Sequence, residues 1–103
     1  MPQNIITLQQ AQTWAQTWRN SPDPSIIAFL IPGIDVTEVL AETYTVNVRS
    51  YLGIDENKNP KLMIVGVDAS GKDLIDDTKG QYIYDFTSGC RPDCDNSSPL
   101  FNL

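Results

Sequence analysis

The feature that most constrains this chain is a pair of apolar segments joined by a short polar connection, between Tyr44 and Val67. In the first segment, residues 44–52, side chains of two kinds alternate along the chain. A period of two predicts a half-buried β-strand with one face toward a core. The two predicted faces are Tyr44, Val46, Val48 and Leu52 on one side, and Thr45, Asn47, Arg49 and Tyr51 on the other.

The second segment, Lys61–Val67, is apolar on both predicted faces, which is typical of a central strand covered from both sides. Residues 55–60 between the two segments are polar turn formers. The sequence therefore predicts an antiparallel hairpin. A hairpin alone is marginally stable in water, so the rest of the chain must cover it.

An amphipathic helix is predicted from Thr7, whose hydroxyl can cap the helix while Gln10 reaches back to it. Residues 20–24 contain two prolines and end the helix. Trp14 and Trp18 lie one turn apart and allow two interpretations: an exposed interaction surface, or bulk that seats the helix on the sheet. We favour the second, because buried aromatic side chains contribute large areas to a core. The apolar stripe is Leu8, Ala11, Trp14, Ala15 and Trp18.

Ser25–Ile31 is a short β-branched and aromatic run, for which a buried strand is the preferred interpretation. The alternative is that this run joins a second helix, leaving a three-stranded meander under two helices. The second helix is predicted to start at Asp35, with Glu38 in the capping-box position, and to end near Thr43.

Residues 74–75 fit either a strand or a helical turn, and the sequence does not decide between them. Gln81–Phe86 alternates and predicts a strand with an aromatic face that includes Tyr82 and Tyr84. These two rings have the shape to bind a flat ligand, but cross-strand packing is the commoner use of such a face. From Thr87 onward the composition is rich in turn formers and has no periodicity.

Together these elements predict an α+β fold of two layers: an antiparallel sheet of three to four strands with two helices packed on one face. The length predicts a single domain, residues 1–103, with an irregular C-terminal tail, residues 87–103.

The tail carries the most distinctive chemistry, Cys90-x-x-x-Cys94 with Pro92 between the thiols. A turn here brings the sulfurs within bridging distance. We favour a structural disulfide over a redox pair, because Asp93 and Asp95 disfavour the reactive thiolate. An intrinsic metal site lacks ligands, since two thiolates are half of a tetrahedral zinc site. We therefore predict no metal and no cofactor.

Charge and composition narrow the function classes. The net charge of −6 argues against binding nucleic acid or anionic lipid. It suits either a freely soluble protein or one with a basic protein partner, and we favour plain solubility as its meaning. The chain contains no histidine, which excludes Ser-His-Asp and Cys-His catalysis within it. No residue set has the arrangement of nucleophile, base and orienting group, so the sequence favours a role without catalysis.

The tail, with Leu52-Gly-Ile-Asp-Glu and Ile83-Tyr-Asp-Phe-Thr, resembles small uncharacterised bacterial proteins that end in Cys, Pro, Cys-Asp and then Ser-Pro-Leu. The resemblance covers mainly the second half and implies a bacterial origin but no activity. The start of the chain lacks the pattern of a signal peptide, so we expect a cytoplasmic location, although a removed leader stays open. The leading hypothesis is a small acidic protein-interaction module. The alternative is a thiol redox or metal-handling protein that uses Cys90 and Cys94.

Overall fold

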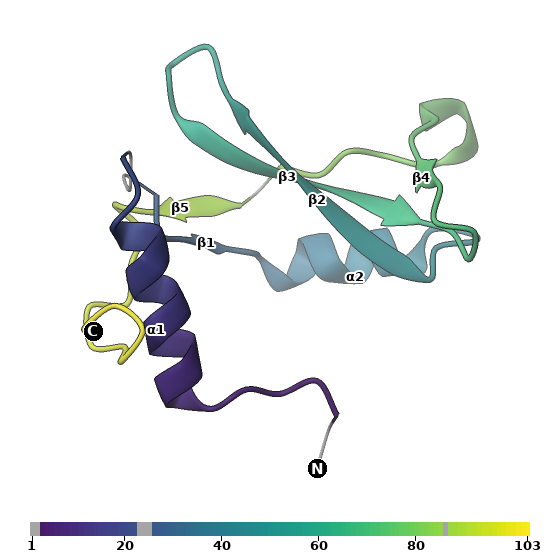
Figure 1. Ribbon diagram of the computed structural model, residues 1–103. Helices are drawn as coiled ribbons and strands as arrows, with labels where there is room; N and C mark the ends of the chain where they lie inside the picture. Colours follow the sequence, from purple (N-terminus) through teal and green to yellow (C-terminus); the bar gives the residue numbers. More distant parts are fainter. Residues whose placement is uncertain (1–2, 23–25, 86) are drawn as a thin grey trace.

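The structure is a computed structural model that describes residues 3–22, 26–85 and 87–103. The described strands form two antiparallel sheets, β2-β3-β4 and β1-β5 (Figure 1). The predicted α+β class, with antiparallel strands and two helices, is confirmed. In chain order the elements are helix α1 (Leu8–Arg19), strand β1 (Ala28–Leu30), helix α2 (Gly33–Ala41), strands β2 (Asn47–Ile54), β3 (Pro60–Val67) and β4 (Asp73–Leu74), the 3-10 helix η1 (Asp77–Lys79) and strand β5 (Ser88–Cys90).

The predicted hairpin is present as β2 and β3, which pair from Asn47 opposite Val67 to Ile54 opposite Pro60. Its turn is held by Asp55, whose side-chain oxygen accepts hydrogen bonds from the backbone N–H groups of Asn57 and Asn59, each 2.9 Å long. Asp and Asn favour such turns because their short side chains bond to nearby backbone. The polar connection therefore reverses the chain as its composition predicts.

The core is small and centres on β3. Helix α2 lies against β3 and buries Val39 completely (Figure 1). The second half of β3 is buried, which confirms the prediction of a covered central strand. The buried apolar residues are Val39, Ile64, Val65, Val67, Leu74 and Cys90.

Strand β2 differs from its prediction in two ways. It begins at Asn47 and not at Tyr44, because Tyr44 has a positive φ of 72° and lies in a turn after α2. Its predicted core face is also exposed, and Leu52 retains 72% of its accessible surface. The exposure follows from its position: β2 is the edge of the sheet, and α2 lies mainly against the neighbouring strand β3.

The tryptophans do not seal the sheet, so their interpretation as core residues is wrong. Trp14 is 62% exposed and Trp18 52% exposed. The reason is that α1 lies beside the C-terminal segment (Figure 1). Its polar residues make the tertiary contact: the Gln12 side-chain amide donates a 3.0 Å hydrogen bond to the carbonyl of Pro99. The capping box of Thr7 is present as predicted.

Two other boundaries are corrected. Helix α2 starts at Gly33, directly after Pro32, and Asp35 is a buried residue of its first turn and does not cap it. In the Ser25–Ile31 segment the strand is limited to β1, and Ser25 lies outside the described residues. Of the undecided residues 74–75, Leu74 is the last residue of the short strand β4, and Ile75 follows the strand.

The predicted strand Gln81–Phe86 is absent from residues 81–85, and Phe86 lies outside the described residues. Isolated bridges replace it, linking Tyr84 to Ile64 and Gln81 to Asp76. Strand β4 already pairs with β3 at Gly66, so the later segment meets β3 at a single position.

The C-terminal segment is not irregular throughout. It begins with β5, which pairs with β1 from Ala28 opposite Cys90 to Leu30 opposite Ser88. The backbone N–H of Ile27 extends this ladder with a 2.8 Å hydrogen bond to the carbonyl of Cys90. Backbone pairing needs no side-chain periodicity, which is why the composition of this segment did not predict a strand.

Candidate binding cleft beside the disulfide

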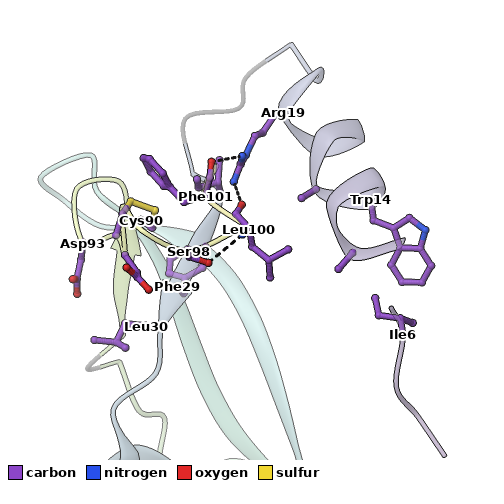
Figure 2. A pocket seen from close by; sticks show the side chains of 16 residues that line it. Ile6, Trp14, Arg19, Phe29, Leu30, Cys90, Asp93, Ser98, Leu100 and Phe101 are labelled. Carbon is purple, nitrogen blue, oxygen red and sulfur yellow. Dashed lines mark hydrogen bonds between the residues drawn. A yellow bond between two sulfur atoms is a disulfide. The ribbon is translucent and has the colours of Figure 1, made fainter. Parts of the chain in front are cut away.

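A cleft of about 450 Å³ lies between α1, the β1-β5 sheet and the end of the chain (Figure 2). Most of its wall is apolar, and its charged lining residues are Arg19, Asp93 and Asp95. Pockets of this size and character are typical binding sites for apolar groups. The lining residues are Ile6, Ala11, Trp14, Ala15, Arg19, Ile27, Ala28, Phe29, Leu30, Cys90, Asp93, Cys94, Asp95, Ser98, Leu100 and Phe101.

Arg19 at the end of α1 holds the wall formed by the C-terminal residues. Its guanidinium donates hydrogen bonds to the carbonyls of Leu100 and Phe101, the second over 2.9 Å (Figure 2). The guanidinium of Arg91 also lies 5.9 Å from the centre of the Phe101 ring, within cation–π range. The guanidinium of Arg19 is planar and carries several donors, which suits its contacts with two backbone oxygens. No local sequence pattern marks Arg19, because its partners lie more than eighty residues away along the chain.

Cys90 and Cys94 form a disulfide on the opposite side of the cleft, with their Cα atoms 4.7 Å apart. Cys90 is buried at the end of β5, and the bond ties the following turn to the sheet. The backbone N–H of Asp93 donates a 3.0 Å hydrogen bond to the carbonyl of Gly89 and closes the same turn. The disulfide predicted from the cysteine spacing is therefore present. Its use as a redox pair remains a prediction.

The turn that the disulfide closes places two acidic side chains, those of Asp93 and Asp95, on the wall of the cleft. Both Asp93 and Asp95 are exposed. The hydroxyl of Ser97, and then its backbone N–H, donate hydrogen bonds to Asp95 at 2.7 and 3.1 Å, and these lower the pKa of that carboxyl. Asp95 is therefore fully ionised at neutral pH.

The structure brings Trp14, Cys90 and Cys94 to one cleft and places the other predicted residues elsewhere. Trp14 lies near Ile6, at the end of the cleft away from the disulfide (Figure 2). Trp18 lines a second hollow of about 460 Å³ between α1 and the tip of the hairpin, where its indole N–H donates to the carbonyl of Ile26.

Tyr82 and Tyr84 lie together beside α2. Their ring centres are 6.5 Å apart in an edge-to-face arrangement. The hydroxyl of Tyr84 and the backbone N–H of Tyr82 both donate hydrogen bonds to one carboxylate oxygen of Glu42. Burial, and then the hydrogen bond to Glu42, raise the pKa of Tyr84 far above its usual value. These rings are engaged with each other and with Glu42, and their role as an interaction surface remains a prediction.

A second polar cluster was also missed from the sequence. Arg49 and Tyr51, both on β2, bind the two carboxylate oxygens of Asp73 on β4. The ion pair with Asp73 raises the pKa of Arg49, and the hydrogen bond to Asp73 raises the pKa of Tyr51. The alternation of residues 44–52 placed Arg49 and Tyr51 on one face, but no local signal pointed to Asp73.

In residues 3–22, 26–85 and 87–103, no group of three or more Cys, Asp or Glu side chains is placed to hold a metal ion. No described helix is both long enough and apolar enough to cross a bilayer.

Comparisons of the chain with protein-family models, with curated proteins and with solved structures find no match.

Proposed function

We propose that this chain is a non-catalytic protein-interaction module whose cleft beside the disulfide receives an apolar side chain of a basic protein partner. The observation that carries the proposal is the amount of surface left open. The folded chain exposes 7581 Å². A compact monomer of this mass exposes about 5,800 Å². The excess of about 1,800 Å² includes many large apolar side chains, and such surface is typical of an interaction site.

The charge of the chain indicates the character of the partner. The net charge is −6, and Asp93 and Asp95 place negative charge directly on the cleft. Arg19, the one cation among the described residues that line the cleft, is already bonded to backbone carbonyls. A lysine or arginine beside an apolar anchor therefore complements this site, and the overall field steers basic partners toward it.

The test uses the whole protein as bait in a native lysate of its source cells. The Trp14→Gln variant removes one of the three aromatic side chains that line the cleft. Leu8→Gln is the matched control, because Leu8 is an exposed apolar residue of the same helix that does not line the cleft. We expect the wild-type and control baits to enrich a basic protein. Trp14→Gln should reduce that enrichment at least about tenfold, as truncation of an aromatic anchor does. Equal recovery by all three baits contradicts the proposal.

The observed disulfide supports a second candidate, a thiol redox protein. In that case the Cys90–Cys94 bond accepts two electrons and two protons from a partner dithiol, giving two thiols here and a disulfide in the partner. Disulfides persist in oxidising compartments and are rare in the cytoplasm except in redox proteins. We also propose that the protein is bacterial and cytoplasmic. The redox state of Cys90 and Cys94 in the cell then helps to distinguish the two functions.

Trapping thiols by alkylation in intact cells distinguishes the two functions. A fully oxidised pair, and unchanged growth when both cysteines are serine, support the structural role. A mixed population that shifts with oxidant supports the redox role.

A further inference from the structure

Strand β2 forms an open edge of the three-stranded sheet. The strand order is β2-β3-β4, and along all eight of its residues β2 pairs with β3 on one side. Within residues 3–22, 26–85 and 87–103, no other strand pairs with it. Half of the backbone N–H and C=O groups of such a strand point away from its neighbour and are free to bind another chain.

The side chains of β2 do not protect this edge. Natural edge strands are protected by charges, prolines, bulges or short length. Residues 47–54 contain no proline and one charge, Arg49, which already forms an ion pair with Asp73. Val48, Leu52 and Ile54 are all exposed. The strand is therefore long, carries one charge that is already paired, and exposes several apolar side chains, as expected for an edge that pairs with another strand.

The chain as a whole leaves enough surface exposed for a stable dimer. The excess over a compact monomer is about 1,800 Å² per chain. Even if half of it were covered on each copy, the two copies would bury about 1,800 Å² together, close to the standard size of a specific interface. Residues 47–54 contain no carboxylate, so pairing of β2 with β2 places no two negative side chains of these strands opposite each other.

We propose that two copies of this chain dimerise by antiparallel pairing of β2 with β2, giving one continuous six-stranded sheet. This inference deepens the proposed function by naming one partner, and it rests on the same open surface. It uses a different part of that surface, so the cleft beside the disulfide stays open to the basic protein.

The residue pattern selects a register with the twofold axis at Ser50. Opposed residues must share a sheet face, so even-numbered positions meet even-numbered ones. With Ser50 opposite its own copy, Val48 faces Leu52, which gives two apolar cross-strand pairs within β2. On the other face Arg49 lies opposite Tyr51.

The neighbouring registers are less favourable. An axis at Arg49 places two like charges directly opposite each other, which is destabilising. An axis at Tyr51 pairs the polar Ser50 with Leu52. At the far edge of the sheet, β4 has only two residues. Pairing therefore closes as a dimer and does not continue into a filament.

A cross-linking experiment tests the register directly. Both native cysteines are held in the disulfide, so an introduced cysteine is the single free thiol. We expect Ser50→Cys to form a covalent dimer rapidly under mild oxidation, because the two thiols meet at the axis. Ser70→Cys is the matched control, since Ser70 is an exposed turn residue away from β2. Equal rates of cross-linking for both variants overturn the proposed register.

A second variant tests dimerisation itself. Leu52 is highly exposed within one chain, so Leu52→Lys leaves the fold of that chain intact. We expect it to raise the dimer dissociation constant at least about tenfold in sedimentation equilibrium, through two lost apolar pairs. Ile75→Lys, an equally apolar-to-charged change beyond β4, should leave the constant unchanged.

The outcomes separate the dimer from the proposed function. A wild-type chain that sediments as a monomer, or a Leu52→Lys variant that dimerises as wild type does, overturns the dimer. Capture of the basic protein by wild type, but not by Trp14→Gln, still supports the interaction module in that case. Circular dichroism of each variant verifies that its helix and strand content is preserved.

Discussion

At the scale of single residues, two positions show how closely the chain fits around β3. Gly66 lies buried in β3, between Val48 of β2 and Leu74 of β4. A Cβ atom at this position would come within 2.6 Å of the hydroxyl oxygen of Thr45. Asp68, just beyond the strand, holds the next turn with three hydrogen bonds from Ser70 and Lys72. The effect of Gly66 on stability depends on its packing against Thr45, and that of Asp68 depends on its hydrogen bonds within the turn.

Substitution of Gly66 by alanine should destabilise the fold. The added methyl group overlaps with Thr45, and overpacking of a well-packed site typically costs about 1–3 kcal/mol. Urea unfolding measures the change in the free energy of unfolding. Gly33→Ala is the control, since a Cβ atom there meets nothing within 4 Å. A Gly66→Ala variant as stable as the wild type would show that β3 is not tightly packed at this point.

Asp68 should make the fold sensitive to acid. The backbone N–H of Lys72, and then the hydroxyl of Ser70, lower the pKa of Asp68 in the folded state. A lowered folded-state pKa gives stability that is present above the unfolded value, about 3.9, and is lost as pH falls through the folded value. We therefore expect the urea concentration at the unfolding midpoint to decrease as the pH drops below about 4. Asp68→Asn, which keeps an acceptor but has no charge, should show a smaller fall over the same range.

At the scale of elements, several contacts hold the C-terminal segment. Strand β5 pairs with β1, the disulfide closes the turn that follows, and Arg19 binds the carbonyls of the last residues. None of these contacts lies in the three-stranded sheet. The cleft beside the disulfide is therefore positioned by the chain end and α1, and its shape depends on both.

Removal of the disulfide should loosen this segment. The bond closes a loop of five residues, for which the loss of unfolded-state entropy is about 2 kcal/mol. We expect the double variant Cys90→Ser/Cys94→Ser to lose about that much stability, and limited proteolysis to cut within residues 91–103 sooner than in the wild type. Reduced wild-type protein is the control and should behave as the double variant does. Unchanged proteolysis would mean that Arg19 and β5 hold the segment without the disulfide.

At the scale of the whole molecule, the chain is more open than a compact domain of its length. Its Cα radius of gyration is 15.7 Å, whereas a compact domain of this length has a radius of about 13 Å. The turn end of the β2-β3 hairpin extends beyond β1, β5 and α2 (Figure 1). Folding of one chain therefore buries about one-sixth less surface than folding to a compact shape would.

This openness predicts a low heat-capacity change for the monomer. The heat-capacity change of unfolding scales with the surface exposed, and a typical domain of this length gives about 1.2–1.5 kcal/mol/K. We expect the Leu52→Lys variant to give a value about one-sixth lower by scanning calorimetry. The wild type should show a transition that rises in temperature with protein concentration, because dimerisation stabilises the folded state by mass action. A concentration-independent transition with a typical heat-capacity change would contradict the open monomer and the dimer together.

Sequence reasoning succeeded where the decisive interactions are local. The Thr7–Gln10 capping box, the turn at Asp55 and the Cys90–Cys94 bond each join residues three or four positions apart. The apolar run of β3 also carried its own signal, because a strand covered on both faces needs apolar residues at every position. The α+β class follows from these elements.

What the sequence by itself determined is therefore the β2-β3 hairpin, the presence of two helices and the disulfide. The tertiary structure decided which surfaces those elements cover. Gln12 and Arg19 bind the C-terminal residues across more than eighty positions of the chain, and this contact leaves Trp14 and Trp18 exposed. The physical reason is that an apolar pattern shows which side chains of an element prefer to be buried. Which other element covers those side chains depends on contacts between residues far apart in the sequence.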